Sequence, residues 1–277
     1  MGDVTASRFA RLASTSVAGT TPGNRHLVML HGIYGRGRNW QAIAKRVVDD
    51  RPDYTCWLLD LRHHGDSEKQ GTPDTLDGLA GDVEQWMTAT GIEAKATLGH
   101  SFGGKVALAL AGRHRDVPLQ TWMIDSTPEA KEPGGGAWEM LRVVRGLPDH
   151  FASRAEAVDG VVAGGYSTGV AQWMATNLER TDDGFRWALD FDVMERLLRD
   201  FFASDLWDVL EHPAPGHDIH VLKATESSVI SAEAVARLES LERSSGQVHL
   251  HQLDGSHWIH AESPDAVAGL LVTHLPR

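Results

Sequence analysis

The chain has 277 residues, of which 42% are hydrophobic and 23% charged, a composition typical of a soluble globular protein. Its formal net charge of −12 argues against nucleic acid as a partner, because proteins that bind nucleic acid present basic surfaces. No apolar run is long enough to predict a membrane span, and the first residues lack the apolar core of a secretion signal, so we predict a cytoplasmic protein.

Short apolar runs alternate with helix-length periodic segments, a pattern typical of βαβ units. Residues 5–18 predict one or two antiparallel strands that open a sheet. The other strands are predicted at 26–30, 55–61, 95–99, 120–125, 219–224 and 248–253. Helices are predicted near 39–50, 75–90, 103–115 and 231–243, and after Pro264. The predicted fold is α/β, with a mostly parallel twisted sheet flanked by helices.

Residues 128–215 interrupt this alternation of predicted strands and helices. The segment begins with the glycine-rich turn EPGGGAW and continues with helical patterns, without a convincing strand. We therefore predict a core made of residues 1–127 and 216–277, with 128–215 inserted as a helical cap or lid. Most aromatic side chains of the cap are expected to pack its own core, and some are expected to line an apolar cleft over the ends of the strands.

A serine stands among glycines in the stretch GHSFGG, residues 99–104. An apolar strand precedes it and a predicted helix follows, and Gly-x-Ser-x-Gly in this context is typical of a nucleophile elbow. The turn is so sharp that the serine takes a strained backbone conformation and its neighbours must be nearly free of side chains. The start of the helix also favours a negative charge that develops nearby. Ser101 is therefore the predicted nucleophile.

With two further motifs, this loop makes the chain resemble the α/β-hydrolase superfamily over nearly its whole length outside 128–215. The stretch LVMLHGIYGRGRNW, residues 27–40, resembles the oxyanion loop of that family. The resemblance implies that the backbone N–H groups of Ile33 and Phe102 form the oxyanion hole. Tyr34 and Trp258 are candidates for lining the substrate pocket.

The second motif, DLRHHGDS at residues 60–67, resembles a D-x-R-x-H-G-x-S turn of the family that is mainly architectural. Arg62 and His64 are accordingly expected to be scaffold groups. His31 is expected to brace the oxyanion loop.

Near the C-terminus, LDGSHWIHAESPDAV resembles the family's G-x-H loop, which implies that His257 is the general base. The nearby His260 is expected to pack beside the loop.

Two residues compete for the role of triad acid. Most of the superfamily carries an aspartate after the strand predicted at 219–224, but here Ser227 takes that place and Glu226 is one residue away. The preceding strand ends in ID-STP, which places Asp125 at its tip. This resembles small bacterial serine esterases whose acid follows the family's sixth strand, with serine in the usual position. Asp125 is the preferred acid and Glu226 the alternative.

The predicted function is cleavage of carboxylic esters or thioesters through an acyl-enzyme on Ser101. The same triad would also serve a C–C bond hydrolase, an acyltransferase or a lyase. Some of these alternative enzymes act on acidic substrates, and cap arginines that face the site would support such a function. The candidates are Arg142, Arg145, Arg154, Arg186 and Arg196. A further alternative is a weakly active ligand-binding or receptor module.

No cofactor is predicted for this chemistry, and the expected partner is a small acyl ester or thioester. The 15 histidines include no strong metal-ligand spacing, so no metal site is predicted. His249 and His251 alternate in VHLHQL and are expected on one face of a strand. The lone Cys56, within an apolar run, is expected to be a core residue. A monomer or a homodimer is expected.

Overall fold

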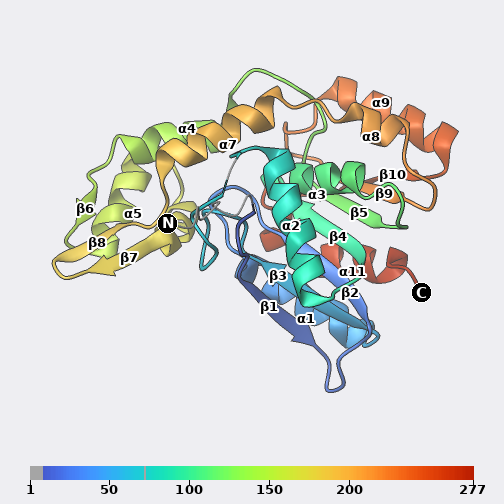
Figure 1. The fold of residues 1–277 in the computed structure, drawn as a ribbon. Coiled ribbons are helices and arrows are strands. Elements are labelled where there is room, and N and C mark those ends of the chain that lie inside the picture. The colour runs from blue at the N-terminus through green and yellow to red at the C-terminus, as the bar shows by residue number, and fades with distance from the viewer. Residues whose placement is uncertain (1–8, 72) are drawn as a thin grey trace, which may run out of the picture.

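The computed structural model describes residues 9–71 and 73–277 and contains a seven-stranded sheet with helices on both faces (Figure 1). The strand order is β1-β3-β2-β4-β5-β9-β10. The strands are β1 (Ser14–Ala18), β2 (Arg25–Leu30), β3 (Tyr54–Leu59), β4 (Ala94–His100), β5 (Gln120–Ile124), β9 (Asp218–Ala224) and β10 (Val248–Leu253). β1 pairs antiparallel with β3, and the other pairs are parallel. The predicted α/β fold is confirmed.

Two layers of helices bury the sheet, which explains why its central strands are apolar along their length. Apolar side chains of α1 (Gln41–Asp50) and α11 (Pro264–His274) pack on one face. The other face is covered by α2 (Leu76–Thr90), α3 (Phe102–Arg113) and α9 (Ala232–Ser245). A short 3₁₀ helix, Gly37–Trp40, precedes α1, and the one-turn helix α10 (Ile259–Glu262) precedes α11.

The N-terminal strand prediction is met in part. Of residues 5–18, the strand β1 covers Ser14–Ala18 at the edge of the sheet, and residues 5–8 lie outside the described part of the chain. None of the described helices is long and apolar enough to cross a membrane.

Residues 128–215 are mainly helical but also contain strands, which corrects the expectation of none. The helices are α4 (Gly135–Arg145), α5 (Arg154–Ala163), α6 (Thr168–Met174), α7 (Phe191–Ala203) and α8 (Trp207–Glu211), with a 3₁₀ turn at Ala175–Asn177. The strands β6 (His150–Phe151), β7 (Leu178–Thr181) and β8 (Gly184–Trp187) form a separate antiparallel sheet. Strands of two to four residues are too short to show a period in the sequence.

Apolar side chains join the 128–215 segment to the core. Met140 of α4 and Leu197 of α7 belong to the same cluster of buried residues as Leu79 of α2 and Val106 of α3. In Figure 1, α4, α5, β6, β7 and β8 lie to one side of the large sheet, and α7 runs back over it toward α8 and α9. The segment is thus packed against the core, while its division from the core at residues 127 and 216 stays a prediction.

A buried lysine crosses this junction. Lys105 of α3 is fully buried, and its ammonium donates hydrogen bonds of 2.7 Å to the backbone oxygens of Glu129 and Phe201. Burial lowers the pKa of Lys105 to about 8. One core side chain therefore holds the backbone near the beginning of the segment and at the end of α7.

Candidate active site

Ser101 sits in a strained turn between β4 and α3. Its φ and ψ are 52° and −117°, and its N–H donates to the Ile124 oxygen at 2.9 Å. The flanking glycines leave room for this turn: a Cβ on Gly99 would lie 2.0 Å from the Gly103 oxygen, and one on Gly103 would lie 2.4 Å from the His31 oxygen. The backbone packs too closely here for any side chain at either position.

The loop after β10 brings His257 to this serine. The distance from His257 Nε2 to Ser101 Oγ is 3.1 Å, within hydrogen-bond range. His257 Nδ1 lies 2.6 Å from Asp125 Oδ2. With the carboxylate as acceptor, the ring hydrogen resides on Nδ1, and Nε2 presents its lone pair to the serine hydroxyl. The structure brings the three predicted triad residues into one hydrogen-bonded row.

Asp125 is held rigidly at the tip of β5. Its side chain is completely buried, and its φ of 44° is rare for a residue other than glycine. The backbone N–H of Ala224 donates to Oδ1 at 3.1 Å, and the Ser227 hydroxyl donates to Oδ2 at 2.5 Å. A buried carboxylate needs such donors, because desolvation without them is costly.

Ser227 therefore has a contact that sequence reasoning did not assign. It replaces the aspartate that most of the superfamily carries at this position, and this replacement was the available signal. The alternative acid, Glu226, has an exposed side chain that makes no hydrogen bond to His257 in the described structure. It lies at the rim of the same cavity.

The two predicted oxyanion-hole residues flank the nucleophile. A Cβ on Gly32 would lie 3.6 Å from Ser101 Cβ, so the loop that carries Ile33 passes directly beside the serine. Phe102 begins α3, where backbone N–H groups have no partner within the helix. In the described parts of the chain, neither the Ile33 N–H nor the Phe102 N–H donates a hydrogen bond. Both donors are therefore free for an acceptor.

Two buried histidines fix the oxyanion loop from below. His31 Nδ1 donates to the Gly32 oxygen at 2.8 Å, and its Nε2 accepts from the Leu61 N–H at 2.9 Å. His64 Nε2 accepts from the Tyr34 N–H at 3.3 Å. Burial lowers the pKa of His31 to about 4 and that of His64 to about 3, so both rings are neutral at pH 7. These contacts make them bracing groups.

Arg62 supports the turn that carries His64. It is fully buried and forms a two-pronged ion pair with Asp82, at 2.6 and 2.7 Å. It has no contact with the cavity.

A third buried histidine supports the predicted base, His257. His100 precedes the nucleophile, and its Nε2 donates to the backbone oxygen of His257 at 2.8 Å. Burial, together with the neighbouring rings of His260 and His257, holds the pKa of His100 well below its usual value. The ring centroids of His100 and His260 are 4.1 Å apart, and His260 packs beside the loop. The sequence singled out the serine of GHSFGG and left this histidine without a role.

A cavity of about 570 Å³ opens beside Ser101 and His257. Its apolar wall includes Tyr34 and Trp258 of the core, together with side chains of the 128–215 segment: Met140, Val170, Trp173, Phe201 and Phe202. The Tyr34 hydroxyl donates to the Ala137 oxygen at 2.9 Å, and the rings of Trp173 and Trp258 meet edge to face at 4.7 Å. The segment thus supplies much of the wall that a substrate would contact.

The five arginines considered above for an acidic substrate lie away from this cavity. Arg142, Arg145, Arg186 and Arg196 pair with carboxylates, and Arg154 donates to backbone oxygens. None of them is among the residues that line the cavity. The cation at its wall is Lys131, whose pKa is lowered by burial and whose ammonium donates to the Val229 oxygen at 3.1 Å.

This fold recurs in known proteins. A family model described as "alpha/beta hydrolase fold" matches residues 25–145. The sn-1-specific diacylglycerol lipase ABHD11 of Xenopus tropicalis is 26% identical over 265 residues, which cover 93% of this chain and 79% of that protein. Esterase YbfF of Escherichia coli (strain K12) is 24% identical over 274 residues, or 91% of this chain and 95% of that one.

Among solved structures, a marine microorganism esterase superposes with a TM-score of 0.80 at 22% identity, over 96% of this chain and 100% of the other. At that identity the superposition speaks for the fold alone. The matched family model and the relatives that align along almost the entire sequence support an α/β hydrolase that is similar to bacterial esterases.

Proposed function

We propose that this protein hydrolyses carboxylic esters through an acyl-enzyme formed on Ser101. The single observation that carries the proposal is the row of hydrogen bonds from Ser101 to His257 to Asp125. The lipase and esterase names of its relatives agree with the same reaction.

In the first half of the reaction, His257 Nε2 takes the Ser101 proton as Oγ attacks the ester carbonyl. The C–O π electrons move onto the carbonyl oxygen, and the N–H groups of Ile33 and Phe102 stabilise the negative charge there. The imidazolium, paired with Asp125, then gives its proton to the leaving alcohol. In the second half, water takes the place of the alcohol, and the acid is released with the enzyme restored.

The wall of the cavity favours an ester with an uncharged acyl group. Its aromatic and aliphatic side chains would bury apolar surface, and the five candidate arginines are engaged elsewhere, which leaves Lys131 as the cation at the wall. This weakens the rival readings that require an acidic substrate. Thioesters share the carbonyl chemistry, and the same site would accept them.

The test is acylation by a chromogenic acyl ester, followed in the first turnover. We expect a burst of one equivalent of alcohol from the wild type and none from Ser101→Ala. Losing the nucleophilic serine of such a triad typically lowers kcat by about 10⁶. As a matched control, Ser244→Ala removes an exposed hydroxyl on α9 and should retain the burst.

Labelling with a fluorophosphonate probe separates the enzyme from a ligand-binding module with an idle triad. We expect stoichiometric labelling that Ser101→Ala abolishes. Full activity in Ser101→Ala, or an unreactive wild type, would reject the proposal.

A further inference from the structure

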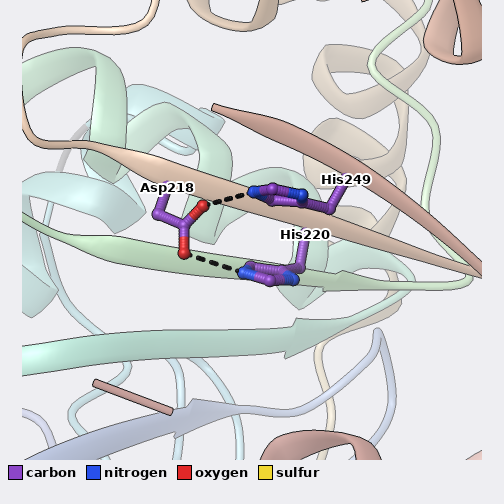
Figure 2. A group of neighbouring side chains, drawn as sticks. All are labelled: Asp218, His220 and His249. Carbon is purple, nitrogen blue, oxygen red and sulfur yellow. Dashed lines mark hydrogen bonds and ion pairs between the residues drawn. The ribbon is translucent and has the colours of Figure 1, made fainter. Parts of the chain in front are cut away.

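Asp218, His220 and His249 converge on one point at the end of the sheet where β9 and β10 begin (Figure 2). His220 Nε2 lies 2.9 Å from Asp218 Oδ2, and His249 Nε2 lies 2.7 Å from Asp218 Oδ1. The three possible ligand atoms all lie within 4.8 Å of one another. Two imidazoles thus approach a single carboxylate from neighbouring strands, each with the same ring nitrogen.

The strand register explains this meeting. His249 of β10 is the direct partner of His220 on β9, so the two rings lie on the same face and stack with centroids 4.6 Å apart. Asp218 stands two residues before His220 on the same strand and therefore on the same face. The backbone sets the positions of all three groups.

The distances between the possible ligand atoms are close to those around a bound divalent transition ion. Ligands about 2.1 Å from a tetrahedral Zn²⁺ are about 3.4 Å from one another. Here His220 Nε2 is 2.9 Å from Asp218 Oδ2 and His249 Nε2 is 2.7 Å from Asp218 Oδ1, and the three ligand atoms lie within 4.8 Å of one another. Shifts of these side chains by about an ångström would bring the three ligand atoms to the tetrahedral spacing. Two imidazoles and a carboxylate suit Zn²⁺ and its neighbours, and they leave a further position for water.

The surroundings resemble those of metal ligands. A metal-bound Nε2 requires that the ring hydrogen reside on Nδ1, where it needs an acceptor. For His220 that acceptor is present, because its Nδ1 lies 2.9 Å from His251 Nε2. The Gln120 amide donates to Asp218 Oδ2 at 2.9 Å, and its own oxygen accepts from Trp122 Nε1 at 2.8 Å. The ligand carboxylate and one ligand ring are thus oriented by further hydrogen bonds.

The site is open on one side and distant from the nucleophile. The side chain of His220 is 2% exposed, whereas those of Asp218 and His249 are 40% and 34% exposed, so an ion can enter from solvent. Asp218 and Ala224 are the two ends of β9, and Ala224 contacts Asp125. At about 3.3 Å per residue, the site is roughly 20 Å from the triad.

We propose that Asp218, His220 and His249 form a binding site for a divalent transition ion, of which Zn²⁺ is the type, that clamps β9 to β10. The alternative is that these three residues only form hydrogen bonds with one another and do not bind a metal ion. The site is independent of ester hydrolysis, so each can fail without the other.

The experiment measures binding of Co²⁺ alone to the untagged, chelator-treated protein, by visible absorption, with Zn²⁺ as competitor. We expect one saturable site that Zn²⁺ displaces. The variants are Asp218→Asn, which keeps the shape of the side chain, and His249→Gln, at a partly exposed position. Because losing a partner of a metal ligand typically weakens binding 10–100-fold, losing a ligand should weaken it at least about 10-fold.

The matched control is His212→Ala, because His212 is an exposed histidine that contacts one carboxylate, Asp208, at 3.0 Å. It should bind Co²⁺ as the wild type does. Saturating Zn²⁺ at about 100 times the wild-type Kd should also raise the Tm of the wild type by roughly 5 °C, and that of Asp218→Asn by about half as much or less. A wild type without a saturable site would overturn the proposal. So would equal affinity in all variants, or weakening in only one of the two.

Discussion

The two ends of the large sheet each carry a carboxylate bonded to imidazole, and the two arrangements differ. At the end where the strands finish, Asp125 is completely buried, has a positive φ and pairs with a single ring, that of His257. At the end where they begin, Asp218 is half exposed and receives two rings. The comparison shows that a carboxylate–imidazole pair alone does not determine the function of a site.

The two sites differ in what the ring nitrogens of their histidines face. The free nitrogen of His257 faces a hydroxyl, so its lone pair can take a proton from Ser101. The rings of His220 and His249 direct the same kind of nitrogen at the carboxylate itself, where a cation could take the place of hydrogen. Under the two proposals, one end moves a proton and the other binds a metal ion.

The largest expected effect comes from making the same substitution at both ends. Asp125→Asn should lower kcat by about 10⁴, because the amide no longer holds the His257 tautomer. Asp218→Asn should leave kcat unchanged, since it is roughly 20 Å from the triad. Steady-state hydrolysis of a chromogenic ester measures both.

Glu226→Gln serves as a second control and should keep most of the activity, since its side chain does not reach His257 in the described structure. If Glu226→Gln lost most of its kcat and Asp125→Asn kept it, Asp125 would not be the triad acid.

A smaller effect is expected from the hydroxyl that supports Asp125. Ser227→Ala removes a 2.5 Å hydrogen bond to a buried carboxylate, an interaction usually worth about 1.5–3 kcal/mol. We expect kcat to fall by about 10-fold or more, and the acidic limb of the kcat–pH profile to move, because the charge that stabilises the imidazolium is less well held. Thr225→Ala, at an exposed position in the same turn, is the control. An unchanged profile in Ser227→Ala would leave this hydroxyl a structural role only.

The last effect is on stability, not on turnover, and concerns the buried histidines beside Ser101. In the unfolded chain His31 and His64 take up protons near pH 6.5, but their folded pKa values are about 4 and about 3, so lowering the pH favours the unfolded state. The free energy of unfolding should therefore fall as pH drops from about 6.5 toward 4, by up to about 1.4 kcal/mol per histidine for each pH unit.

Urea unfolding at a series of pH values measures this slope. His64→Gln should make it shallower, and the exposed His212→Ala should not. An identical slope in His64→Gln and the wild type would show that this ring is not the source.

Most of the core could be predicted from sequence because its signals are local. Apolar runs marked the parallel strands, and the glycines around Ser101 marked the tight turn. The choice between Asp125 and Glu226 could not be settled in this way, because it depends on which strand end lies against the histidine loop. The strand β6 could not be predicted from the sequence, because its two residues are too few to show a hydrophobic period.

The cluster at the opposite end shows the same limit. His249 was expected to share a strand face with His251, and Asp218 and His220 also alternate along one strand. What the sequence does not contain is the register that sets His249 opposite His220. Without that pairing, three ordinary residues give no ligand spacing.

The buried ammonium of Lys105 limits how this enzyme could be re-engineered. Its two acceptors are backbone oxygens, which any sequence can supply, provided that the chain follows the same path past the lysine. Substrate preference could thus be altered by exchanging side chains along α4 and α7. A transplanted 128–215 segment of different backbone geometry would leave a cation without a partner in the protein interior. Hybrids between relatives should accordingly exchange this lysine together with the 128–215 segment.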